Sequence, residues 1–199
     1  SYLKIVQFLE KLPRRPVLAA FTATATGQVR DDIERALELW KPIRVLTGFD
    51  RPNLSYNVLR PKGKAAALRA LLEQHRGQSG IIYCATRNTV EKLCAELYAA
   101  GVLATRYHAG LSDAERRKNQ EDFLDNYCTI MVATNAFGMG IDKPNVRFVI
   151  HYNMPKSLEA YYQEAGRAGR DGEKADCILL YSAADIQMAR FLIQNAGEN

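Results

Sequence analysis

The feature that most constrains the fold is the alternation of short apolar runs with amphipathic helical patterns along most of this 199-residue chain. Several of the runs are continuously hydrophobic, as strands covered on both faces are. They lie at residues 17–21, 43–46, 80–84, 104–107, 129–133, 146–151 and 177–181. Because a repeated strand–helix–strand order places the strands parallel in one sheet, we predict an α/β fold, a parallel sheet flanked by helices on both sides.

The helices between these runs have recognisable ends. A helix expected near residues 88–100 places four apolar side chains on one face, and Gly101 ends it; the four are Val90, Leu93, Cys94 and Leu97. The next helix opens at Ser112, which forms a capping-box pattern with Glu115. A last helix is expected at residues 183–195.

Domain boundaries follow from the Gly and Pro punctuation at residues 48–53, where both periodicities break and then restart. Residues 1–47 hold two expected strands and two expected helices, too few for a closed sheet, so we interpret them as the end of a preceding domain. Residues 48–181 would form a complete α/β domain, and residues 182–199 a terminal helix that belongs to it or begins the next domain. Since Ser1 lies inside a helical pattern, both ends are expected to lie within a longer protein.

Net charge and hydropathy narrow the class of partner only slightly. The formal net charge of +5 and the pI near 9.0 suit an anionic partner but do not require one, because the charges are dispersed. No apolar run is long enough to span a membrane, and the first residues lack a signal-peptide layout, so no membrane partner is expected.

The four cysteines and three histidines do not have the spacing of zinc ligands. No C-x-x-C pair occurs, and the histidines are scattered. We therefore expect no metal site in this chain, and buried, reduced thiols of a cytosolic or nuclear protein.

Two arginines three residues apart, Arg167 and Arg170, follow a helical pattern, and a glycine precedes each of them. Residues at this spacing share a helix face, so both guanidinium groups can point into one cleft. Arginine binds phosphate oxygens bidentately, so the pair suits a triphosphate, with Gln163 and Glu164 placed to orient it. The alternative is a solvated basic helix end.

Polar side chains follow several of the predicted strands. Thr86, Asn88 and the first amides of the following helix can hold a phosphate, or can simply cap that helix. Thr22 and Thr24 likewise either contact a ligand or form an ordinary capped loop. Thr134 follows another predicted strand, and its hydroxyl would be offered to a ligand there.

Gly138 and Gly140 permit close approach of the backbone to phosphate, or only a tight turn. A dinucleotide fingerprint is excluded because Lys143 stands at the third glycine position.

The loop that grips triphosphates, G-x-x-x-x-G-K-[ST], does not occur in the chain. Its only Gly-Lys pair, Gly63-Lys64, is followed by Ala65, and Val58 stands where the upstream glycine is needed. An Asp-Glu dipeptide that could hold magnesium is absent as well. The chain therefore has groups that complement a bound nucleotide but lacks the principal groups that bind one.

Two long motifs resemble those of the RecQ family of superfamily 2 DNA helicases: residues 137–147 (FGMGIDKPNVR) and residues 161–172 (YYQEAGRAGRDG). Shorter motifs of the same family begin at Thr22, Ile81, Tyr107 and Val132, in the expected order. The resemblance runs from about residue 17 to residue 193. It implies a RecA-like fold, with the end of a first lobe at 1–47 and the second lobe at 48–181.

The resemblance also implies roles for individual residues. It makes Arg167 and Arg170 arginine fingers and turns three further residues toward the nucleotide: Gly140, Asp142 and Gln163. It places the nucleic acid against five side chains, namely Thr86, Arg87, Asn88, His108 and Thr134, although a histidine like His108 is more often a satisfied loop residue than a ligand. It assigns the coupling of ATP hydrolysis to DNA engagement to Thr22, Ala23 and Thr24.

The function implied is that of the second motor lobe of an ATP-dependent 3′-to-5′ DNA helicase, acting on single-stranded and duplex DNA. ATP and Mg²⁺ would be held by a first lobe upstream in the same protein, and zinc by a module downstream. Such a protein would work in the cytoplasm and nucleoid of a bacterium or in a eukaryotic nucleus. Two alternatives stay open, a stand-alone nucleic-acid-binding module without ATPase activity and a lobe of an RNA helicase.

Overall fold

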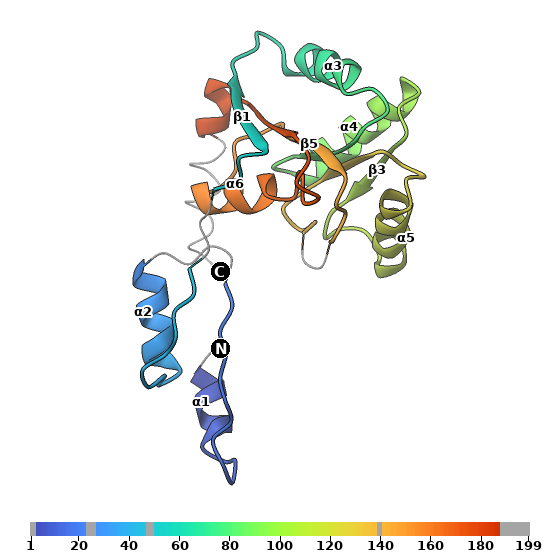
Figure 1. The fold of residues 1–199 in the computed structure, drawn as a ribbon. Coiled ribbons are helices and arrows are strands. Elements are labelled where there is room, and N and C mark those ends of the chain that lie inside the picture. The colour runs from blue at the N-terminus through green and yellow to red at the C-terminus, as the bar shows by residue number, and fades with distance from the viewer. Residues whose placement is uncertain (1–2, 23–26, 47–49, 139–140, 188–199) are drawn as a thin grey trace. The chain divides into compact units, whose positions relative to one another are not determined.

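The computed structural model describes residues 3–22, 27–46, 50–138 and 141–187 (Figure 1). The chain divides into two compact units, Ser1–Asp50 and Arg51–Asn199. No helix of the described residues is long and apolar enough to cross a membrane.

The first unit contains helices α1 (Leu3–Leu9) and α2 (Gly27–Ala36). Arg15, after α1, donates from Nη2 to the carbonyl oxygen of Leu37, just after α2, at 2.7 Å and so links the two helical segments. The strands predicted at 17–21 and 43–46 are wrong: both segments lack strand structure, and Val17 and Ile43 are almost fully exposed. A strand needs a hydrogen-bonded neighbour, and the described residues of this unit provide none.

The second unit is built on a six-stranded sheet in the order β1-β6-β5-β2-β4-β3. Every strand pair is parallel, which confirms the predicted α/β class. The strands are β1 (Leu54–Leu59), β2 (Ser79–Tyr83), β3 (Ala104–Tyr107), β4 (Ile130–Ala133), β5 (Val146–His151) and β6 (Ala175–Leu180). Sequence patterns missed β1, because this edge strand buries only Leu54 and so lacks the continuous apolar run of the others.

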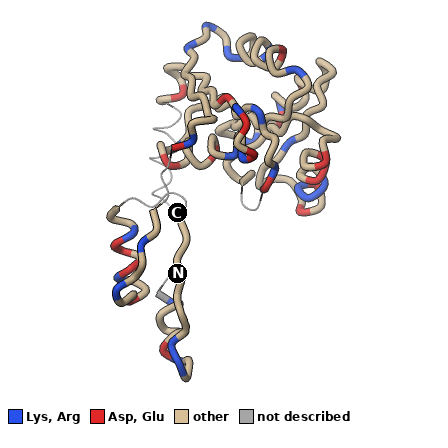
Figure 2. The backbone as a smooth tube through the Cα atoms, in the orientation of Figure 1, with Lys and Arg blue, Asp and Glu red and all other residues tan. Residues whose placement is uncertain are grey.

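Two helices cover each face of the sheet (Figure 1). Alternate residues of β2 divide between the faces: Ile81 joins the cluster under α5 and α6, whereas Ile82 joins the cluster under α3 and α4. The helices are α3 (Lys64–Gln74), α4 (Arg87–Ala99), α5 (Asp113–Leu124) and α6 (Leu158–Ala165). Figure 2 shows that acidic and basic residues alternate along α5, as on a solvated helix face.

The helix ends agree with the sequence signals. Gly101, just after α4, has a φ of 77°, a left-handed conformation in which glycine is favoured. Ser112 and Glu115 form the expected capping box at the start of α5. Residues 183–187 are helical, and the rest of the last predicted helix lies outside the described residues.

The cysteines are free thiols, and all but the half-buried Cys128 are buried. Burial raises the pKa of Cys84 to about 12, and the pKa of Cys177 to about 12 as well. Both groups therefore stay protonated and unreactive at neutral pH, as the sequence predicts for core thiols.

Replacing Gly80 with alanine is expected to destabilise the second unit by about 1–3 kcal/mol. Gly80 in β2 lies beside Phe148 in β5, and a β-carbon on Gly80 would stand 2.1 Å from the Phe148 ring. The ring is fully buried and has no room to retreat. Urea unfolding measures the effect. In a Phe148→Ala background the same substitution should cost much less, and an equal cost in both backgrounds would rule out the clash.

Candidate functional site

Three adjacent strands bring the expected nucleic-acid residues to one edge of the sheet. β2, β4 and β3 lie side by side and parallel, so their carboxyl ends meet. The segment 86–88 follows β2, Thr134 follows β4, and His108 follows β3. Ligands of open α/β sheets bind beyond such carboxyl ends, so the topology joins residues that are far apart in the sequence.

Thr86 is the N-cap of α4, and its hydroxyl accepts a hydrogen bond from the backbone N–H of Thr89 at 3.2 Å. Arg87 and Asn88, in the first turn of that helix, are exposed. A β-carbon on Gly110 would stand 3.1 Å from Arg87 Nη1, so the arginine lies against the loop that follows β3. The capping alternative for Thr86 is therefore present, and it leaves Arg87 at the surface beside the helix N-terminus, where a phosphate would be attracted.

His108 has the properties of a structural histidine. Its ring is buried, the N–H of Gly110 donates to Nδ1 at 3.1 Å, and Nε2 lies 2.7 Å from a Glu91 carboxylate oxygen. Because Nδ1 accepts, Nε2 must carry the proton that is donated to Glu91. His108 thus fixes the shape of its loop, and direct contact between its ring and DNA stays a prediction.

Thr134 is also buried, and its hydroxyl accepts a hydrogen bond from the N–H of Ala136 at 3.4 Å. The backbone N–H of Thr134 donates to the carbonyl of Tyr107 at 3.1 Å, which ties the turn after β4 to the end of β3. The side chain shapes this turn, and a hydrogen bond from it to DNA stays a prediction.

The arginine pair occupies the loop that follows α6, on the sheet face covered by α5 and α6. Arg167 donates from Nη1 to the carbonyl of Gly138 at 2.6 Å, and its buried Nε has no partner among the described residues. A β-carbon on Gly138 would stand only 2.2 Å from Arg167 Nη2. Gly138 is therefore required for close approach to a guanidinium group.

Arg170 is more accessible than Arg167. It donates from Nη1 to the carbonyl of Ile141 at 2.8 Å and to the carboxylate of Asp142 at 3.1 Å. The Asp142 side chain is 85% exposed, so this ion pair lies in water and is weak. Both arginines are thus held over the segment 138–142. Gly140 lies outside the described residues.

Three polar side chains lie close to this site, the buried Tyr83 and His151 and the partly buried Glu164. The Tyr83 hydroxyl donates to the carbonyl of Phe137 at 3.1 Å, and His151 Nε2 lies 2.9 Å from a Glu164 carboxylate oxygen. Burial raises the pKa of Tyr83, against the opposing charge of Arg167. Glu164 therefore anchors α6 to β5 through His151, and Gln163 is exposed.

The sequence patterns did not identify two residues that contact the arginine loop, which is the segment 166–172 after α6. Arg51 and Asn53, interpreted there only as part of a domain boundary, donate hydrogen bonds to the loop's backbone carbonyls. The only sequence signal for them was the charged Arg51 beside Pro52 in the boundary segment.

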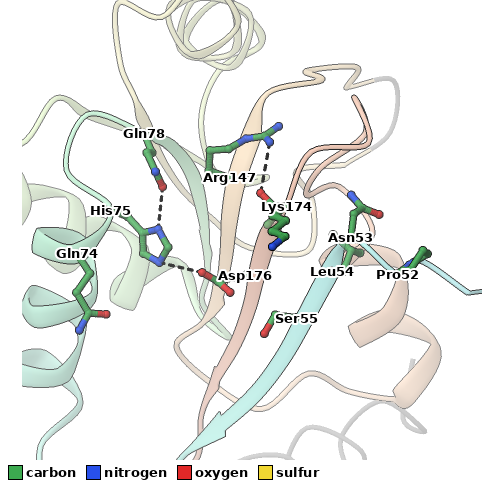
Figure 3. Close-up of a pocket in the computed structure, with 11 residues that line it drawn as sticks. Pro52, Asn53, Leu54, Ser55, Gln74, His75, Gln78, Arg147, Lys174 and Asp176 are labelled. Atoms are coloured by element: carbon green, nitrogen blue, oxygen red, sulfur yellow. Dashed lines mark hydrogen bonds and ion pairs between the residues drawn. The ribbon is translucent and has the colours of Figure 1, made fainter.

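A pocket of about 520 Å³ lies at the opposite edge of the sheet, around the amino ends of β1 and β6 (Figure 3). It contains none of the expected site residues. Figure 3 shows His75 between Gln78 and Asp176, and Arg147 turned to the backbone of Lys174. Arg147 also binds both carboxylate oxygens of Asp171 and lowers the pKa of that group, so the guanidinium group of this pocket residue is already paired.

The remaining predicted groups belong to the first unit. Thr22 is exposed in the first unit, whereas Ala23 and Thr24 lie outside the described residues. Over the described part of the chain, no three His, Cys, Asp or Glu side chains are grouped as metal ligands would be.

Comparison with known proteins identifies the family of the chain. Residues 63–172 match the family model "Helicase conserved C-terminal domain". The chain is 46% identical to the ATP-dependent DNA helicase RecQ of Bacillus subtilis, in an alignment that covers 98% of this chain and 33% of that protein. It is 44% identical to the RecQ-like DNA helicase BLM of Xenopus laevis, in an alignment that covers 98% of this chain and 14% of that protein. It is also 45% identical to a putative ATP-dependent RNA helicase of Acanthamoeba polyphaga mimivirus, in an alignment that covers all of this chain and 36% of that protein. The chain thus spans about a third of the first relatives it matches.

The fold has close counterparts among solved structures. S. cerevisiae Dbp5 bound to RNA and ADP BeF3 matches with a TM-score of 0.78 at 23% identity, over 97% of this chain and 51% of that one. At this identity the likeness supports the RecA-like fold alone.

Proposed function

Because this chain belongs to the helicase conserved C-terminal domain family and is RecQ-like in sequence, we propose that it is the second motor lobe of an ATP-dependent DNA helicase that moves 3′ to 5′. In this proposal Arg170, helped by Arg167, stabilises the γ-phosphate of an ATP molecule bound by a first lobe elsewhere in the protein. Exposed groups at the carboxyl edge of the sheet, Arg87 foremost, contact the backbone of single-stranded DNA.

The observation that carries the proposal is the pair of guanidinium groups held over one loop. Arg167 donates to the carbonyl of Gly138, and Arg170 donates to the carbonyl of Ile141. These contacts fix the orientation of both guanidinium groups, and so of the N–H groups that remain to bind a phosphate. Phosphoryl transfer depends mostly on positioning and on charge stabilisation, and an arginine finger contributes about 10³–10⁵ in rate. This chain lacks a triphosphate-binding loop but has such an arginine pair. It is therefore suited to supply the arginine-bearing half of an ATPase site whose other half binds the nucleotide.

The contact between Arg170 and Asp142 gives the resting position of the finger. Since the pair is exposed, a phosphate with higher charge can displace Asp142 from Arg170 at little cost. Binding of ATP between the lobes would then draw Arg170 onto the γ-phosphate, and hydrolysis would release it. Magnesium ligands are assigned to the first lobe, since the described residues here form no cluster of metal-binding side chains.

The experiment that tests the proposal compares DNA-stimulated ATP turnover by the isolated 199-residue chain and by the full-length protein. We expect turnover only in the full-length protein, because the chain has no G-x-x-x-x-G-K-[ST] loop. Robust turnover by the isolated chain would contradict the division of the site between two lobes. DNA binding without turnover by either protein would favour a stand-alone binding module.

An RNA helicase lobe is the second candidate function, favoured by the similarity to the mimivirus protein named as a putative RNA helicase. Strand displacement by the full-length protein on matched DNA and RNA duplexes decides between them. We expect displacement of DNA, and displacement confined to RNA would overturn this part of the proposal.

A further inference from the structure

Arg51 contacts the backbone of the arginine loop at three carbonyls. Its Nη2 donates to the carbonyls of Ala168 and Gly169, both at 3.0 Å, and its Nη1 reaches the carbonyl of Gly166 at 3.4 Å. These carbonyls lie on both sides of Arg167 and directly before Arg170 in the chain. One side chain more than a hundred residues away in sequence therefore fixes the backbone from which both fingers project.

Asn53 makes a second attachment to the same loop. Its Nδ2 donates to the carbonyls of Gly169 and Glu173, both at 2.9 Å. Its own carbonyl accepts the N–H of Ala175 at 3.0 Å, which joins it to the start of β6. The loop is thus held on both sides of Arg170.

Gly169 makes this close contact possible. It adopts a φ of 55°, and a β-carbon there would stand 2.5 Å from Asn53 Nδ2 and 2.6 Å from the carbonyl oxygen of Glu173. Only glycine combines this left-handed conformation with so close an approach. The glycine before Arg170 therefore serves the attachment to Asn53, whereas the sequence suggested only a helix end.

Arg51 is the first residue of the second unit, and its contacts with the arginine loop lie within that unit. Arginine suits this place because its planar fork donates to several acceptors at once, which the single ammonium group of lysine cannot do in the same geometry.

We propose that Arg51 and Asn53 are positioning residues that fix the placement of the arginine fingers Arg167 and Arg170. This inference rests on the proposed function of Arg170. Neither residue touches the nucleotide in this account, and both act through the loop backbone.

The test measures steady-state ATP turnover by the full-length protein with saturating DNA, for Arg51→Lys and for Asn53→Ala. Because a displacement of about 1 Å costs on the order of 10²-fold in rate, we expect kcat to fall by about tenfold or more for Arg51→Lys. The KM for ATP should change by less than about twofold, since the first lobe holds the nucleotide. Arg76→Lys is the matched control, because Arg76 pairs only with the exposed Glu73 side chain, and its kcat should stay at the wild-type value.

A double variant separates positioning from a general loss of structure. If Arg51 acts through Arg170, adding Arg51→Lys to Arg170→Ala should lower kcat little further, while thermal unfolding of Arg51→Lys stays near wild type. Losses that multiply in the double variant, or an unchanged kcat for Arg51→Lys, would overturn the inference. Unchanged turnover in Arg170→Ala itself would instead refute the proposed function, so the two failures are distinguishable.

Discussion

Replacing Arg170 with alanine in the full-length protein is expected to lower DNA-stimulated ATP turnover by about tenfold at least, and by about 10³-fold or more if the finger acts alone. The substitution removes the accessible guanidinium group that pairs with Asp142 and donates to the Ile141 carbonyl. Affinity for single-stranded DNA should remain nearly intact, because the groups expected to contact DNA lie at the carboxyl edge of the sheet.

Arg76→Ala serves as the control for this prediction, since it also removes one exposed arginine from the second unit. It should leave both turnover and DNA affinity unchanged. Turnover by Arg170→Ala equal to that of the control would exclude a catalytic role for Arg170. A parallel loss of DNA affinity would instead assign Arg170 to the nucleic acid.

Replacing Gly138 with alanine should lower ATP turnover by about 10²-fold with little loss of stability. The added β-carbon would stand 2.2 Å from Arg167 Nη2, and the guanidinium group, at the end of a flexible side chain, would move away rather than unfold the loop. The substitution therefore displaces a finger without deleting it. Steady-state turnover and thermal unfolding of the full-length variant measure the two effects.

Gly63→Ala is the matched control, because a β-carbon on Gly63 meets nothing within 4 Å. Its turnover should equal that of the wild type. Should Gly138→Ala retain full turnover, the placement of Arg167 against the segment 138–142 would have no part in catalysis.

The central strands were predictable because burial on both faces imposes an unbroken apolar run. The predicted segment 146–151 coincides with β5, and the predicted segment 129–133 contains β4, Ile130–Ala133. Patterns failed where that constraint is missing: β1 is an exposed edge strand, and the apolar segments 17–21 and 43–46 have no strand to pair with. An apolar run thus predicts a strand only when the rest of its sheet is present.

The candidate site was predictable as a set of motifs but not as a geometry. The spacing predicts that Arg167 and Arg170 share a helix face, but α6 ends at Ala165 and both arginines lie in the loop that follows it. The sequence also carries no information about the carbonyls of Gly138 and Ile141 that receive them. The burial of His108 and its bond with Glu91 depend on the packing of α4 against β3. Arg51 was missed because its partners are backbone carbonyls, which have no sequence signature.

The central claim is that Arg170 stabilises the transition state of ATP hydrolysis on another lobe, and one binding measurement tests it most directly. The affinities of the full-length protein for ADP and for ADP with aluminium fluoride, a transition-state analogue, are compared in wild type and Arg170→Ala. We expect the variant to lose about tenfold or more in affinity for the analogue and less than about twofold for ADP, because a catalytic group binds the transition state selectively. Equal affinities of both proteins for the analogue would contradict the account.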